Sequence, residues 1–351
     1  MHAEDNHASI PKVSVMIPCY NSGVILRDTL ESLVHQTFTD WEAVCVNDIS
    51  TDGTRNTLEE YASKYPDKFL IVDNELVGGK KKCHPYNLGW MNTRGEWVVD
   101  LSHDDVLSSN FLEAVMERLY ETGADAIVST VGRFVTRPED GKLVLSGLDG
   151  DLDAVISGRE AVMLSLDWRI TGFCCWRGDI ARSTLINEEE VPYDWGELES
   201  RKRFSRCRTV AFSKGIYWHR FNPTSVTRIP WGRRSHMRLV TNREVLSLLV
   251  AGHYPKQIID FYRIATYRLF CVSCVKFRVS DFYKKHSEAR REVHEELRAY
   301  YQDERILDRP SLAGLCPSWL DQFRLRHYWS VIPITIWRKF MNRLLKRPSI
   351  F

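Results

Sequence analysis

The chain has 351 residues, of which 44% are hydrophobic and 27% are charged, and its formal net charge is +2. This length and composition indicate a folded protein that can bury a full core and contain more than one domain. The nearly balanced charge argues against wholesale binding of nucleic acid.

The nine cysteines have no regular spacing, which favours free thiols in a reducing compartment. The first ten residues lack an apolar signal core, and no apolar run approaches the about 20 residues of a membrane span. We therefore expect a cytoplasmic protein, with residues 1–11 forming a disordered tail.

The first hundred residues alternate between strand patterns and helix patterns. Helical spacing of leucines and other apolar residues recurs at 26–34, at 55–64 and in a helix through Leu88 and Met91. Short runs rich in β-branched and aromatic residues predict buried strands, and they lie at 13–17, 43–46, 69–72 and 97–99. This alternation predicts an α/β fold with a mainly parallel sheet and right-handed crossovers.

Polar residues follow three of these strands, namely Pro18–Asn21, Asp48 and the pair Asp104 and Asp105. The carboxyl ends of parallel strands meet at one edge of an open sheet, where ligands bind. Adjacent carboxylates repel each other unless a cation or donor groups lie between them, and such oxygen ligands suit Mg²⁺ or Mn²⁺. The alternative is that the two aspartates only open a turn before the next helix.

The following segment continues the α/β pattern. A helix from Asn110 is predicted to begin with a capping box formed by Asn110 and Glu113. We expect a strand at 126–129, a hairpin of 133–136 with 143–146, and helices at 157–166 and 195–204.

Three motifs occur in an order that resembles family 2 glycosyltransferases: Lys12–Asn21 (KVSVMIPCYN), Ser32–Phe38 and Val46–Thr54. The resemblance extends from about Lys12 to Thr227. It implies a glycosyltransferase A catalytic domain at 12–228, with a nucleotide-binding half at 12–108 and an acceptor half at 109–228. It also implies an inverting reaction, a nucleotide-diphosphate sugar donor and a divalent metal, Mn²⁺ or Mg²⁺.

The resemblance also assigns roles to single residues. Asp48 would accept a hydrogen bond from the base, which makes uridine the expected nucleoside because uracil offers an N–H. Asp104 would bind the metal with Asp105, and one of the two would reach the ribose. Arg220 would approach the diphosphate. The complete predicted donor site is Pro18, Tyr20, Asn21, Asp48, Lys81, Lys82, Asn87, Asp104 and Arg220.

Three positions depart from the family pattern. Asn47 stands where the family has a first acid, Ser102 replaces the first acid of its D-x-D signature, and Tyr86 replaces an arginine. Lys81 and Lys82, in a run of three lysines, would supply the lost positive charge near the diphosphate. The alternative for this run is a solvated loop.

Residues 191–198 resemble the Glu-Asp-Trp helix start of the family, with Tyr193 in place of the glutamate. Asp194 is then the catalytic base, a role that requires an ionised carboxylate within about 3 Å of the acceptor hydroxyl. Asp194 is also a good N-cap for the helix that follows. Glu197 is the nearest rival base.

The region 229–351 is predicted to be helical, with candidates at 240–251, 256–276, 279–302 and 316–326. Its last helix has apolar residues such as Phe340 and Leu344 on one face and basic residues such as Arg343 and Lys346 on the other. This pattern is typical of a helix lying in a membrane interface. The alternative is a terminal helix that docks on the domain.

The sequence thus favours an inverting glycosyltransferase that moves a sugar, most simply a UDP-linked hexose or N-acetylhexosamine, to a glycan or lipid-linked acceptor in surface polysaccharide synthesis. Its location would be the inner face of the plasma membrane. A catalytically degenerate nucleotide-sugar-binding protein is the alternative, motivated by Asn47, Ser102 and Tyr86. A nucleotidyltransferase is expected to have a glycine-rich phosphate loop after its first strand, and Pro18–Gly23 is not such a loop.

Overall fold

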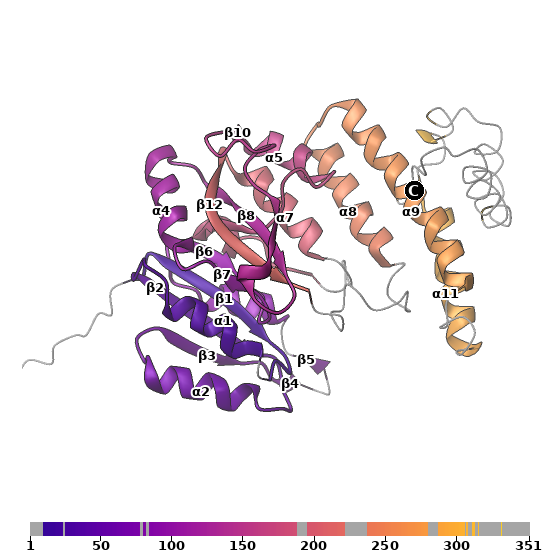
Figure 1. The fold of residues 1–351 in the computed structure, drawn as a ribbon. Coiled ribbons are helices and arrows are strands. Elements are labelled where there is room, and N and C mark those ends of the chain that lie inside the picture. Colours follow the sequence, from indigo (N-terminus) through magenta and orange to yellow (C-terminus); the bar gives the residue numbers. More distant parts are fainter. Residues whose placement is uncertain are drawn as a thin grey trace, which may run out of the picture. The chain divides into compact units, whose positions relative to one another are not determined.

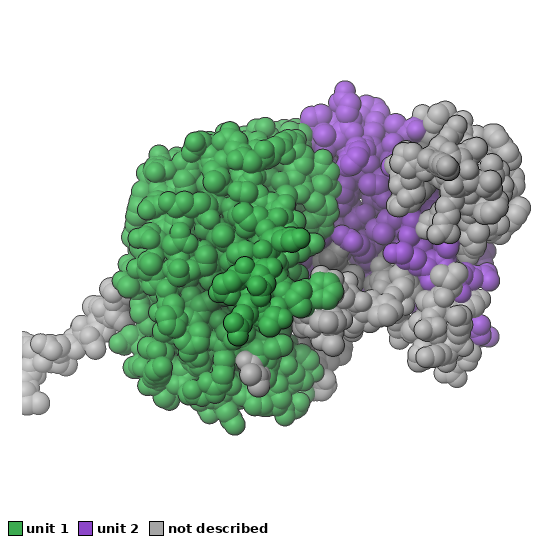
Figure 2. Space-filling view, in the orientation of Figure 1, with its two compact units in different colours: residues 1–186, 199–222 green, residues 187–198, 223–351 purple. Residues whose placement is uncertain are grey.

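The computed structural model describes residues 10–23, 25–77, 80–81, 84–187, 195–221, 237–279 and 287–305, and the single positions 307, 311, 312, 315 and 331. The chain divides into two compact units, residues 1–186 with 199–222 and residues 187–198 with 223–351 (Figure 2). From the sequence we predicted a single domain boundary at 228. The grouping of 187–198 with the second unit was not predicted.

The first half of unit 1 is a parallel α/β arrangement (Figure 1). Its strands stand in the order β3-β2-β1-β6, and every neighbouring pair is parallel. The predicted strands and crossover helices are confirmed. Their bounds are β1 Val13–Cys19, α1 Ile25–Val34, β2 Trp41–Asn47, α2 Thr54–Lys64, β3 Phe69–Asp73, α3 Pro85–Asn92 and β6 Trp97–Asp100.

The second half of unit 1 extends the same sheet. Strand β11 (Cys174–Arg177) lies antiparallel between β6 and β8 (Ala126–Phe134). Strand β12 (Thr209–Arg220) runs parallel to β8, so that β8 and β12 share the direction of β6. Most strands of the described sheet therefore run one way, as predicted for this mainly parallel sheet.

The remaining elements of unit 1 are short strands and helices, namely β4 Leu76–Val77, β5 Lys80–Lys81, β7 Val106–Leu107, α4 Phe111–Thr122, η1 Pro138–Asp140, β9 Lys142–Leu145, β10 Val155–Ser157, α5 Gly158–Ser165 and α6 Gly178–Arg182. Helix α7 (Trp195–Arg206) begins in the segment grouped with unit 2 and continues into unit 1 from residue 199. Strand β9 pairs antiparallel with β8, which confirms the predicted hairpin. Strands β4 and β5 form a separate small sheet.

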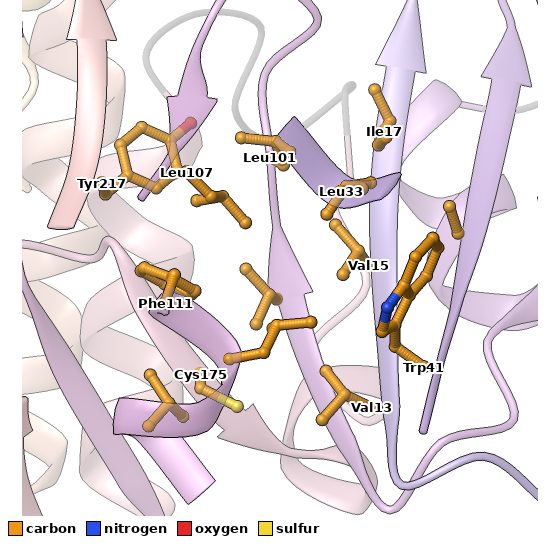
Figure 3. Close-up of a cluster of buried hydrophobic side chains, with 14 of the residues drawn as sticks. Val13, Val15, Ile17, Leu33, Trp41, Leu101, Leu107, Phe111, Cys175 and Tyr217 are labelled. Carbon is orange, nitrogen blue, oxygen red and sulfur yellow. The ribbon is translucent and has the colours of Figure 1, made fainter. Parts of the chain in front are cut away.

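A continuous hydrophobic core lies on one face of the sheet, under α1, α2 and α4. Figure 3 shows Val13, Val15 and Ile17 of β1 on this face, near Leu33 of α1. All seven residues of β1 are buried, because helices cover both faces of the sheet. On the other face, Gly89 of α3 meets β1 so closely that an added Cβ would lie 2.4 Å from Met16 Cγ.

The predicted capping box of α4 is wrong, because the Asn110 side chain makes no cap hydrogen bond. Its carboxamide oxygen instead accepts a hydrogen bond from Ser108 Oγ at 3.0 Å. The Glu113 carboxylate accepts one from Thr37 Oγ1 at 2.9 Å. The bond from Thr37 ties the start of α4 to the loop after α1, and a local motif cannot predict a partner so far away in the sequence.

Unit 2 is helical in its described part, with α8 Arg238–Ala251, α9 Lys256–Val279 and α11 Ser287–Gln302. Cys271 and Cys274 belong to a buried cluster with Phe270, Phe277 and Leu297, so the C-x-x-C spacing serves helix packing here. None of the helices among the described residues is both long enough and apolar enough to span a membrane. The predicted helix at 316–326 and the basic amphipathic helix lie outside the described residues.

Candidate active site

The carboxyl ends of β1, β2 and β6 meet at one edge of the sheet and are joined there by hydrogen bonds. The Asp48 amide donates to the Cys19 carbonyl at 2.8 Å, which connects β2 to β1. His103 Nδ1 lies 3.2 Å from the Pro18 carbonyl oxygen, which connects the segment after β6 to β1. The structure therefore brings together the three polar strand ends that the sequence singled out.

The loop after β1 is fixed to the loop after β2. Asn21 has a φ of 44°, a left-handed conformation that asparagine tolerates better than most residues. Its carboxamide oxygen accepts from the Thr51 amide at 2.8 Å, and its own amide donates to Ser50 Oγ at 3.2 Å. Tyr20 is left 54% exposed at this edge, where its ring can contact a ligand.

Asp48 is buried, and its carboxylate accepts a hydrogen bond from Asn74 Nδ2 at 2.8 Å. The neighbouring Asn47 donates from its side chain to Asp73 Oδ1 at 2.8 Å. An acid at position 47 would face the carboxylate of Asp73, so asparagine is the residue that this contact requires. Asn74, which follows β3, is a site residue that sequence reasoning missed.

Asp105 is turned into the protein, although the sequence proposed it as a metal ligand. Its two carboxylate oxygens accept from the Tyr217 hydroxyl and the Arg220 amide, each at 2.8 Å. Burial, together with the charge of the neighbouring Asp104, raises the pKa of the Asp105 carboxyl to about 7. Asp105 therefore anchors the turn that carries the partly exposed Asp104, and Asp104 is the better candidate for a ligand.

Arg220 supports the same turn from the end of β12. Its Nε donates to the Asp104 carbonyl oxygen at 2.8 Å, and its Nη2 donates to Asp28 at 2.7 Å. The guanidinium also lies 4.6 Å from the centre of the Phe134 ring. These contacts give Arg220 a structural role, and its predicted approach to a diphosphate stays a prediction.

Asn87 of α3 is buried, and both ends of its carboxamide bond to Ile186, Nδ2 to the carbonyl and Oδ1 to the amide, each at 2.8 Å. Asn87 thus holds the chain just before the segment that contains Asp194. Asp194 and Lys82 lie outside the described residues, and Lys81 belongs to the small hairpin of β4 and β5.

Two of the departures from the family pattern lie close together. Burial and the charge of Asp100 raise the pKa of Tyr86, and the nearby Ser102 side chain lowers it. Tyr86 also meets Trp90 edge-on at 5.7 Å. An arginine and an aspartate are thus replaced together by a neutral pair, so the local charge balance is preserved.

A buried network below this edge was not foreseen from the sequence. Arg203 of α7 donates from Nη1 to Asp100 Oδ2 at 2.7 Å, and its guanidinium lies 4.1 Å from the centre of the Trp90 ring. Trp90 Nε1 donates to the other oxygen of Asp100 at 2.6 Å. The network ties α7 to the end of β6. The signal available in the sequence was Asp100, a single acid at the end of an apolar strand.

Among the described residues, no group of three or more histidine, cysteine, aspartate or glutamate side chains could hold a metal by itself. A single accessible carboxylate can still serve Mg²⁺ or Mn²⁺, because Mg²⁺ is usually bound through one or two carboxylates together with substrate phosphates. Asp104 is the candidate because it is partly exposed, whereas both carboxylate oxygens of Asp105 accept hydrogen bonds within the protein.

The sheet and the polar edge define a glycosyltransferase A fold. Among solved structures, S. aureus TarS 1–349 in complex with UDP-GlcNAc is similar in fold, with a TM-score of 0.58, 17% identity, and coverage of 78% of this chain and 76% of that one. Residues 14–159 match the family model described as Glycosyl transferase family 2. Residues 14–159 therefore carry a domain of this family.

Curated relatives agree with this assignment. The uncharacterized glycosyltransferase EpsJ of Bacillus subtilis is 25% identical over 230 residues, covering 63% of this chain and 64% of EpsJ. Glycosyltransferase GlyG of Streptococcus pneumoniae is 26% identical over 231 residues, covering 63% of this chain and 76% of GlyG. Chondroitin synthase of Escherichia coli is 30% identical over 255 residues, covering 70% of this chain. The chain spans less than two thirds of several relatives, with 64% of EpsJ and 34% of chondroitin synthase.

Proposed function

We propose that the chain transfers a sugar, with inversion, from a nucleotide-diphosphate sugar to a hydroxyl of a glycan or lipid-linked acceptor in surface polysaccharide synthesis. The observation that carries the proposal is the junction of three polar strand ends, in which Pro18, Asp48 and the Asp104 turn are bonded together at one sheet edge. The names of the relatives, which include a chondroitin synthase, support a glycan product.

The donor would bind across this edge. Tyr20, Asn21 and Pro18 would line the nucleotide pocket, and Asp48 would accept the N–H of the base. Uridine is favoured because a carboxylate can accept from uracil, and because structures of TarS hold UDP and UDP-GlcNAc. Lys81 and Lys82 would add positive charge near the diphosphate. Tyr86 and Ser102 are both neutral, so the exchange of an arginine and an aspartate for this pair leaves the net charge unchanged, which is compatible with activity.

For the reaction, Asp104 would hold the divalent metal against the diphosphate, where a bound cation stabilises the leaving group. Asp105, Tyr217 and Arg220 keep the Asp104 turn in place, so that little reorganisation is needed when the donor arrives. Asp194 would take the proton of the acceptor hydroxyl as it attacks the anomeric carbon. We also propose peripheral contact with the inner face of the plasma membrane, on the sequence pattern of the last helix.

A screen of UDP-sugars tests the proposal. With Mn²⁺ or Mg²⁺ we expect slow hydrolysis of at least one UDP-sugar, which EDTA abolishes and Asp104→Ala reduces strongly, because the leaving group loses its cation. Asp67→Ala, which alters an exposed aspartate between α2 and β3, is the matched control and should behave as wild type. Full activity in EDTA together with an unimpaired Asp104→Ala would remove the metal from the mechanism.

The role of Asp48 predicts a change in base selectivity. Asp48→Ala should weaken UDP binding by about 1–3 kcal/mol, the scale of a lost hydrogen bond to a charged group, and should abolish a preference for UDP over CDP, since cytosine N3 carries no hydrogen. Calorimetry with both nucleotides measures this effect. Asn74→Ala is the control, because it removes the support of Asp48 but leaves the carboxylate. Unchanged UDP and CDP affinities in Asp48→Ala would place Asp48 outside the pocket.

A further inference from the structure

A groove of about 460 Å³ lies in unit 1 between α1, β7, η1 and the end of β12, within the range of small-molecule sites. Of its lining residues, Arg220 alone belongs to the predicted donor site. Its lining combines an indole with charged and hydroxyl side chains, including Trp218, Arg137, Glu139, Asp28 and His35.

Trp218 is fixed in the wall of the groove by two glycines. A Cβ added at Gly132 or at Gly141 would lie 2.3 Å from atoms of the Trp218 ring, so a side chain at either position would displace the indole. Phe134 meets the same ring at 90° with the centroids 6.5 Å apart. Gly141 has a φ of −77°, which any residue can adopt, so the glycine is explained by the close approach of the indole and of the Pro138 and Arg133 carbonyl oxygens.

The charges of the groove are mixed. Asp28 is paired with Arg220 at 2.7 Å, and Glu31 accepts a hydrogen bond from Tyr61 and lies 3.5 Å from His35. The side chains of Arg137 and Glu139 have no ion-pair partner within the part of the chain that the structure describes. Carboxylate and guanidinium groups side by side suit a neutral polyol, which donates to one and accepts from the other. The carboxylates of Asp28, Glu31 and Glu139 would repel a polyanion.

The groove also adjoins the candidate active site. Arg220 lines it and donates to the carbonyl oxygen of Asp104 at 2.8 Å. Strand β7, another part of the wall, begins at Val106, directly after Asp105. A chain of sugars in the groove would therefore lie next to the turn that carries the proposed metal ligand.

We propose that this groove binds a neutral oligosaccharide stretch of the acceptor. One sugar would stack its C–H face on Trp218, because the face of an aromatic ring is electron-rich, and its hydroxyls would bond to Arg137 and Glu139. The inference rests on the proposed transfer to a glycan. It specifies an acceptor that extends beyond the sugar at the reaction centre.

The test measures binding of maltotetraose, cellotetraose and chitotetraose to the full chain by saturation-transfer NMR and calorimetry. We expect at least one to bind, with affinity at least tenfold lower in Trp218→Ala and several-fold lower in the double variant Arg137→Ala/Glu139→Ala. Trp168→Ala, which removes an indole that is 53% exposed and does not line the groove, should bind like wild type. UDP affinity should be unchanged in all variants.

The double variant alters surface side chains, so it carries the test if Trp218→Ala fails to fold. Absence of binding by all three tetrasaccharides, or equal binding in wild type and both groove variants, would overturn the proposal. Displacement of the saccharide by polyphosphate, if this displacement requires Arg137, would also overturn the proposal in favour of an anionic ligand. A wild-type protein that neither binds UDP nor hydrolyses a UDP-sugar would refute the proposed transfer. This is a separate result, and saccharide binding would then be judged by itself.

Discussion

Asp194→Asn is expected to lower the rate of sugar transfer by about 10²–10⁴-fold, the usual contribution of a positioned general base. Donor affinity should stay nearly unchanged, because the base acts on the acceptor hydroxyl and not on the nucleotide. Asparagine caps a helix about as well as aspartate, so thermal stability should hardly move. Steady-state kinetics, nucleotide-sugar calorimetry and a melting curve on the same samples separate these effects.

Glu197→Gln is the control for this experiment, since Glu197 lies in the first turn of α7 and is the rival carboxylate. A normal rate in Asp194→Asn beside an inactive Glu197→Gln would assign the base to Glu197. If both variants transfer sugar at the wild-type rate, Asp194 serves only as a cap. A wild-type protein that binds a nucleotide sugar but transfers nothing to any acceptor would favour the degenerate binding protein.

The fold could be predicted largely from the sequence, because each central strand is a short apolar run bounded by polar residues. Strand β1 is the clearest case, since it is buried along its whole length and ends at Cys19, between the proline and the tyrosine of the family motif. The edge of the sheet at which a ligand would bind could be predicted from the parallel strand order alone. These features depend on local pattern, and local pattern is what a single sequence displays.

The details of the site depend on contacts between distant residues, and these could not be predicted. Asn74 reaches Asp48 only because β3 pairs with β2. Asp105 was proposed as a metal ligand, but Tyr217, more than a hundred residues later, takes one of its oxygens. Tyr86 and Ser102 looked like two separate losses of charge, whereas their proximity makes them one exchange.

The second large effect is expected at Arg203, which is 2% exposed. Arg203→Met keeps most of the volume but leaves the Asp100 carboxylate without its cation, and breaking a buried pair in this way costs about 3–5 kcal/mol. Asp100 is 23% exposed, so we expect the lower part of that range. The midpoint of urea unfolding, followed by tryptophan fluorescence, measures the change in the free energy of unfolding.

A double-mutant cycle distinguishes the pair from simple loss of packing. Asp100→Asn removes the charge but keeps an oxygen for the Trp90 indole, so Asp100→Asn/Arg203→Met should be more stable than the sum of the single changes predicts. The matched control is Lys12→Met, which breaks the 2.7 Å pair with Glu96, where the side chains are 42% and 54% exposed. Exposed pairs of this kind contribute about 0.2–1 kcal/mol. Strict additivity, or an Arg203→Met as mild as Lys12→Met, would refute the buried pair. A true pair would mean that the helix following Asp194 in the sequence is held to the strand leading to Asp104, so that one network positions the helix of the proposed base and the strand of the proposed metal ligand.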